Sequence, residues 1–86
     1  MPSYLVETYL PRGDAGERAA LELRARSAAA ELTRVRFDRS FHVLEDEICL
    51  FVFVAPSGVD AALVAQRAGL EPIRVVEAFT SGVTEL

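Results

Sequence analysis

Residues 35–57, VRFDRSFHVLEDEICLFVFVAPS, decide the fold, because two different strand patterns follow each other there across a short acidic turn. Residues 35–44 alternate with the period of a strand, and the many charges suit an edge position. One face is predicted to carry Val35, Phe37, Arg39, Phe41 and Val43, and the other Arg36, Asp38, Ser40 and His42. Residues 47–55 form a continuous β-branched and aromatic run, which is typical of a central strand covered on both faces. With Glu45 and Asp46 as the turn, these segments predict a β-hairpin.

A strand and a helix are predicted before this hairpin. Residues 3–10 have strand composition and end at a Pro-Arg-Gly breaker. A helix is predicted over residues 14–33, because Asp14 and Glu17 have the spacing of a capping box. Its inward stripe is predicted to be Leu21, Ala25, Ala28 and Leu32.

A second helix and a last strand are predicted after the hairpin. Ser57 is the expected N-cap of the helix, and Gly69 is expected to end it in the left-handed conformation. The inner face of this helix is predicted to carry Val59, Ala62 and Leu63. Residues 73–79 predict the strand, and residues 80–86 a loose tail or an arm across a partner.

The order strand, helix, hairpin, helix, strand (βαββαβ) predicts one α+β domain over residues 1–86 with a ferredoxin-like fold. Right-handed crossovers would place the first and third strands in the middle of an antiparallel sheet, with both helices on one face. The other face still carries apolar side chains, and a second copy of the chain is the economical cover for it. We therefore expect a homodimer, a dimeric α+β barrel that encloses a small cavity.

Composition excludes several classes of partner. The 9 basic residues are all arginine and form no stripe, and against 13 acidic residues they leave a net charge of −4. Binding to nucleic acid or to a membrane surface is therefore not expected. The N-terminus lacks the features of a signal peptide, and the longest apolar run, residues 48–55, is too short to span a bilayer. Together with the lone Cys49, these features predict a cytoplasmic protein.

Glu7 is the first candidate for chemistry, because an ionised side chain in a central strand is costly unless it is paired. We expect it on the pocket face with Tyr9, Arg39 and Glu77, and with Arg39 as its partner. It is then either a positioned carboxylate, acting as base or ligand anchor, or half of a structural salt bridge.

Four aromatic residues are candidates for the wall of a ligand site, or else for ordinary core: Phe37, Phe41, Phe51 and Phe53. His42 is expected to point away from Arg39 and to lie half-exposed at an edge. Cys49 is expected to be a small core residue. The sequence has no nucleophile elbow and no glycine-rich phosphate loop, so no cofactor is expected.

Taken together, the segments YLVE (4–7), FDRSF (37–41), APS (55–57) and RAGL (67–70) resemble a known family. It consists of small bacterial ferredoxin-like proteins of largely unknown function, named after a dimeric nickel-binding member from actinobacteria. The resemblance covers residues 2–78 and needs no gap between the second strand and the Ala-Pro turn. It implies the same fold, a homodimer and a metal-binding function.

The chain departs from the family where metal ligands are expected. The family pattern Trp-x-His-Ser-Tyr has Arg39 in place of its histidine, and Cys-x-Tyr-Glu-Ala-Pro is replaced by residues 51–56, FVFVAP. A family histidine in the second helix falls near Val64, and Glu7 alone among the polar positions is kept. Arginine cannot coordinate nickel, so we expect no metal site.

These observations favour a homodimeric protein that binds a small organic molecule carrying a carboxylate or a polarised carbonyl. Glu7 would be its base or anchor, Arg39 its oxyanion clamp and Tyr9 a hydrogen-bond donor. If the protein is an enzyme, analogy with the fold suggests a cofactor-independent cyclase or isomerase. The alternatives are a nickel- or divalent-metal-binding protein and a structural or regulatory interaction module.

Overall fold

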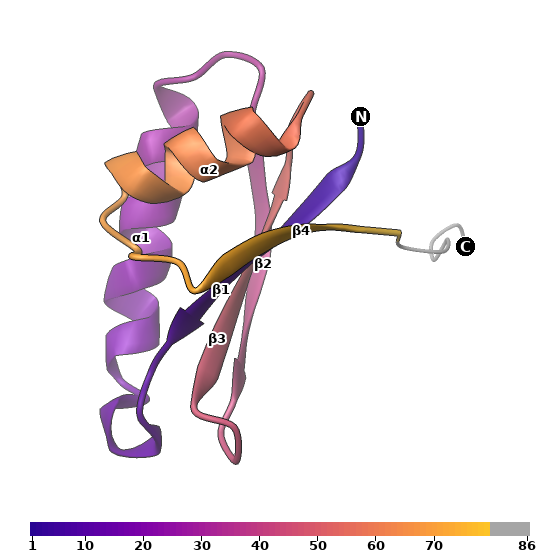
Figure 1. Ribbon diagram of the computed structural model, residues 1–86. Coiled ribbons are helices and arrows are strands. Elements are labelled where there is room, and N and C mark those ends of the chain that lie inside the picture. The colour runs from indigo at the N-terminus through magenta and orange to yellow at the C-terminus, as the bar shows by residue number, and fades with distance from the viewer. Residues whose placement is uncertain (80–86) are drawn as a thin grey trace, which may run out of the picture.

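A computed structural model describes residues 1–79, which form an antiparallel sheet with two helices on one side (Figure 1). The elements are β1 (Ser3–Tyr9), the 3-10 helix η1 (Arg12–Asp14), α1 (Glu17–Ala30), β2 (Arg36–Val43), β3 (Ile48–Val54), α2 (Gly58–Arg67) and β4 (Arg74–Ala78). The strand order is β2-β3-β1-β4, which confirms that the first and third strands are central. The protein therefore has the ferredoxin-like α+β fold. The predicted tail or arm, residues 80–86, lies outside the described residues.

The core fills the space between the sheet and the helices, where α1 lies over β2 and β3, and α2 over β1 and β4 (Figure 1). The sheet supplies aromatic rings: Phe37 packs edge-on against Phe53 with the ring centroids 5.4 Å apart, and Phe51 is fully buried. The helices supply small side chains, mainly Ala25, Ala28, Ala29, Ala61, Ala65 and Ala68. Alanine on a helix permits close approach to the sheet, so the rings fill the volume that larger helical residues would otherwise occupy.

Helix α1 shows the predicted inner stripe but not the predicted start. Ala25 and Ala28 are buried, and Leu21 and Leu32 pack against the core, as expected. The capping box, however, was wrongly predicted. Asp14 ends the 3-10 turn, and the N-cap of α1 is Gly16, which has no side chain to bond the first free N–H groups.

Helix α2 has the predicted ends but a different inner face. Ser57 is its N-cap and accepts a hydrogen bond from the Asp60 backbone N–H at 3.3 Å, and Gly69 has φ +71°. Val59 is 79% exposed, so its prediction as an inner residue was wrong. The buried stripe is instead Ala61, Val64, Ala65 and Ala68. Three of the four buried residues are alanine, which allows the helix to pack closely against the sheet, while Val59 and Leu63 are left at the surface.

Strand β2 contains a β-bulge that changes which side chains share a face. The register with β3 shifts between Phe37 and Arg39, so Asp38 is an extra residue without a partner. The expectation that Phe37 and Arg39 face the same way is therefore wrong. Phe37 points to the helices, and Arg39 points to the opposite side, because one added residue reverses the alternation.

Candidate functional site

The sheet has a covered face under the helices and an open face on its other side (Figure 1). Register and alternation place these side chains on the open face: Arg36, Arg39, Phe41 and Val43 of β2; Ile48, Leu50, Val52 and Val54 of β3; Ser3, Leu5, Glu7 and Tyr9 of β1; Arg74, Val76 and Ala78 of β4. Most of them are apolar. Val52, at the centre, is only 3% exposed because its neighbours already surround it.

Glu7 lies on the open face as expected, but its partner is Arg74. The Arg74 Nε–H donates to Glu7 Oε2 at 2.8 Å, and the two residues face each other in the register of β1 and β4. The Glu7 side chain is 18% exposed and that of Arg74 is 63% exposed. Glu7 is thus a sheltered carboxylate beside a guanidinium group that still reaches solvent.

Tyr9 follows Glu7 on the same face and is joined to the β2–β3 turn. Its hydroxyl donates to Glu47 Oε1 at 3.4 Å, and the other carboxylate oxygen of Glu47 accepts from the Arg12 backbone N–H at 3.0 Å. Glu47 adopts a left-handed backbone with φ 54°, which is uncommon for a residue with a side chain. Glu47 therefore ties the turn to the end of β1 and fixes the position of the Tyr9 hydroxyl.

Arg39 also lies on the open face, but it does not reach Glu7 within one chain. Strand β3 separates β2 from β1, so the two backbones lie about 10 Å apart at the usual strand spacing. The ion pair of Arg39 is with Asp38 of the bulge, where Nε and Oδ2 are 3.3 Å apart. Since the Arg39 side chain is 64% exposed, its terminal N–H groups are accessible for other acceptors.

The candidate aromatic wall is divided between the two faces. Phe37, Phe51 and Phe53 lie in the core under the helices, whereas Phe41 is on the open face and 47% exposed. Glu77 pairs in register with Tyr4, so it faces away from Glu7.

Two hollows can be described among residues 1–79, and neither is lined by Glu7, Tyr9 or Arg39. One, of about 580 Å³, is lined by Glu77 together with Met1, Pro2, Ser3, Ala78 and Phe79. The other, of about 320 Å³, lies between α1 and α2. Glu7, Tyr9 and Arg39 lie on the open face of the sheet, so an enclosed site around them would need a second molecule over that face.

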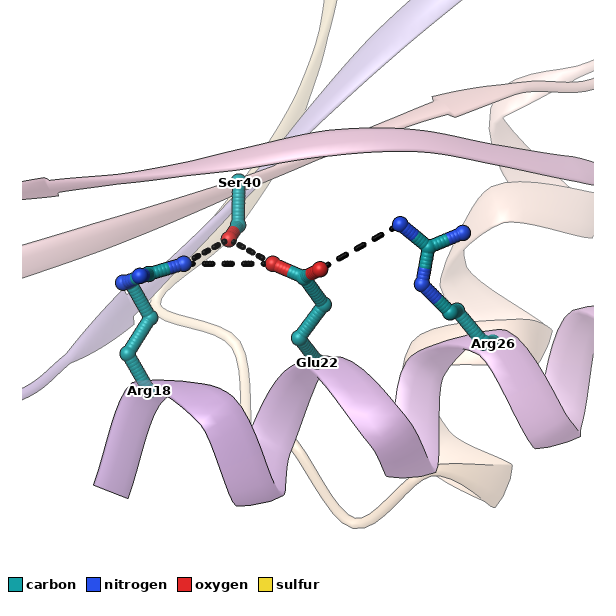
Figure 2. Close-up of polar contacts among 4 residues, drawn as sticks. All are labelled: Arg18, Glu22, Arg26 and Ser40. Atoms are coloured by element: carbon teal, nitrogen blue, oxygen red, sulfur yellow. Dashed lines mark hydrogen bonds and ion pairs between the residues drawn. The ribbon is translucent and has the colours of Figure 1, made fainter. Parts of the chain in front are cut away.

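A polar cluster under α1 was not anticipated from the sequence (Figure 2). Ser40 of β2 donates to Glu22 Oε1 at 2.6 Å, and Arg18 Nη1 donates to the same oxygen at 3.2 Å. Arg26 Nη2 donates to Glu22 Oε2 at 3.3 Å. The Ser40 hydrogen bond first, and then Arg26 and Arg18, hold the pKa of Glu22 below its usual value of 4.5. Both carboxylate oxygens are occupied, so the cluster joins α1 to β2 and offers no free reactive group.

His42 and Cys49 are neighbours on the covered face, facing each other in the β2–β3 register. His42 points away from Arg39, as predicted, and its Nε2–H donates to the Leu10 carbonyl at 2.9 Å. Cys49 is fully buried, and burial raises the pKa of its thiol to about 11. A buried, protonated thiol is a poor nucleophile despite the adjacent histidine, so Cys49 is a core residue as predicted.

Within residues 1–79, no three His, Cys, Asp or Glu side chains converge in a way that would hold a metal ion. Neither of the helices described has the length and apolar character that crossing a bilayer requires. Comparison with protein-family models, with curated proteins and with solved structures finds no significant match. The resemblance to the nickel-binding family thus gains no support from these comparisons and stays an expectation.

Proposed function

We propose that the protein is a homodimer that binds a small organic molecule between the open faces of its two sheets. The observation that carries the proposal is the composition of the open face. Apolar side chains, including Leu5, Leu50, Val52 and Val76, surround the Glu7–Arg74 ion pair. A contiguous apolar face on a small domain marks a site of association, and a second copy covers it with matching chemistry.

The polar groups of the open face set the chemistry of the ligand. Arg74 and Arg39 present accessible guanidinium groups, which bind carboxylate and polarised carbonyl oxygens. Tyr9 offers a hydroxyl held by Glu47, and Phe41 offers a ring for an apolar or flat part of the ligand. If the ligand reacts, Glu7 is the group able to take a proton, and a cofactor-independent isomerisation or cyclisation is the matching reaction class.

Native mass spectrometry of the purified protein, with and without nickel, is the first test. We expect a dimer that is indifferent to nickel and retains an organic mass. A monomer at every soluble concentration would overturn the proposal. Stoichiometric binding of nickel would replace it with the metal-binding alternative. A dimer that retains no organic molecule would favour a structural or regulatory module.

A matched pair of variants tests which surface associates. Val43, on the open face, and Leu63, on α2, are both 38% exposed. Val43→Lys should convert the dimer to monomer, because it places a charge in the proposed interface, whereas Leu63→Lys should leave the dimer intact. The opposite result would move the interface to the helical side. In the dimer, Glu7→Gln should abolish ligand retention without changing the oligomeric state.

A further inference from the structure

The β2–β3 hairpin is strongly polarised in charge along its length. At the start of β2 lies a basic end, consisting of Arg34, Arg36 and Arg39 with Asp38 as the one acidic residue among them. Arg36 and Arg39 pair in register with Val54 and Val52, so they are adjacent on the open face. All three arginines are exposed.

The other end of the hairpin is an acidic turn. Glu45, Asp46 and Glu47 follow each other in the sequence, and Glu45 and Asp46 are exposed. Of these three acidic side chains, Glu47 is the one that accepts hydrogen bonds, from the Tyr9 hydroxyl and the Arg12 backbone N–H. Strand β2 has 8 residues, so at the usual rise per residue Arg36 lies about 25 Å from the acidic turn, and Arg39, in the middle of the strand, lies at a separation of about 15 Å. Both separations exceed the screening length of about 8–10 Å at ordinary salt, so the two ends do not neutralise each other within one chain.

The symmetry of a face-to-face dimer leaves two arrangements to compare. A two-fold axis along the strands keeps like ends together but exchanges the two edges of the sheet, so β2 of one copy lies over β4 of the other and the charged ends of the two hairpins do not meet. A two-fold axis across the strands stacks opposite ends, so that each basic end meets an acidic turn, and symmetry makes this contact twice. Opposite charges across an interface steer association and fix its register, so the charges of the hairpin favour the second arrangement.

We propose that the two sheets associate with opposite ends together, the basic end of each copy packing against the acidic turn of the other. This inference rests on the dimer of the proposed function and adds how the two sheets are oriented relative to each other. Because Glu47 holds Tyr9 at the acidic turn, Arg36 and Arg39 of the partner subunit lie beside the Tyr9 end of each ligand site. Each site is then incomplete in one chain, and the partner's arginines supply the cations that bind an anionic ligand there.

Charge reversal at each end tests the register. The variant Arg36→Glu/Arg39→Glu has two acidic ends, and the variant Glu45→Arg/Asp46→Arg has two basic ends. We expect each alone to dimerise on the order of 100-fold more weakly than the natural chain, since like charges then meet at both contacts. Mixed in equal amounts, they should form a heterodimer, because every contact again joins opposite charges. Sedimentation velocity gives the affinities, and native mass spectrometry of the mixture distinguishes heterodimer from homodimers.

The results separate this inference from the proposed dimer. If the natural chain is monomeric, both fail. If the natural chain dimerises, and both variants dimerise as tightly as it does with random mixing, the register is wrong and the dimer stands. Arg67→Glu, which reverses a charge in the exposed Glu31–Arg67 pair on the helical side, is the control and should leave the affinity unchanged. Circular dichroism establishes that each variant is folded, and the single changes Arg36→Glu and Asp46→Arg replace any double variant that is not.

Discussion

The two faces of the sheet are built from the same strands, yet they place comparable side chains in opposite situations. On β3, Phe51 and Phe53 are fully buried under the helices, while the alternating Leu50 and Val54 remain partly accessible on the open face. On the covered face Ser40 and His42 are hydrogen-bonded, whereas on the open face Arg39 and Arg74 keep accessible donors. The difference indicates a division of work, with the covered face stabilising the protomer and the open face available for association.

The largest effect is expected from removing an aromatic ring from the covered face, which tests whether that face forms the core. Phe51→Ala should lower the free energy of unfolding by about 3–5 kcal/mol, because it leaves a cavity that the alanine-lined helices cannot fill. Urea unfolding measures the loss of stability. If the alanine variant does not fold, Phe51→Leu is measured instead, because it leaves a smaller cavity and should cost less. A loss below about 1 kcal/mol would show that the covered face is not the core.

A substitution of Thr8 tests whether buried hydrogen bonds on the covered face also stabilise the protomer. Its hydroxyl donates to the Leu70 carbonyl, and Thr8 is 4% exposed. Thr8→Val keeps the shape but leaves that carbonyl without its buried donor, so we expect a loss of about 1–3 kcal/mol in urea unfolding. Thr33→Val, at an exposed position, is the control and should change stability little.

Glu22 gives the covered face a pH dependence of known sign. Its folded-state pKa is lowered below 4.5, so the carboxylate stabilises the fold above that value, and this contribution is lost as the pH falls through the folded pKa. Glu22→Gln should therefore cost about 1 kcal/mol at pH 7, and the gap to the natural protein should close below pH 4.5.

Thermal unfolding at pH 7 and at pH 3 measures both quantities for Glu22→Gln. Glu31→Gln, which loses only an exposed ion pair with Arg67, should cost at most about 0.5 kcal/mol. Equal losses in the two variants would mean that the partly buried Glu22 cluster contributes no more than a surface pair.

Phe41 should give the smallest effect of the series on the protomer. Because the ring is 47% exposed on the open face, Phe41→Ala should cost less than about 1 kcal/mol when unfolding is followed at a concentration where the protein is monomeric. The same change should measurably weaken the dimer that we propose. A loss as large as that of Phe51→Ala would contradict the division between the two faces.

Periodicity and local signals were sufficient to predict the fold. Alternation in residues 35–44, the apolar run after it and the Ser57 and Gly69 signals each depend on nearby residues, and the structure confirms these elements. The start of α1 was missed because the η1 turn took up Asp14. The inner face of α2 was missed because alanine-rich helices offer several stripes of similar hydrophobicity, and only packing against the sheet selects one.

The candidate site was less accessible to sequence reasoning, because its partners come from the pairing of distant strands. Alternation and position were sufficient to predict that Glu7, Tyr9 and Arg39 share one face of the sheet. The partner of Glu7 depends on the β1–β4 register, which no local pattern in residues 73–79 specifies. The Glu22–Ser40 contact likewise depends on how α1 lies over β2.

The bulge at Asp38 has a consequence for how related sequences should be aligned. A single inserted or deleted residue at this point would exchange the side chains that face the helices for those that face outward, while leaving the strand itself in place. If one homologue has the bulge and another has a regular strand of equal length, identical residues can be aligned with each other although their side chains lie on opposite faces of the sheet. Column-by-column transfer of ligand residues across residues 36–39 is therefore valid only between chains that share this bulge.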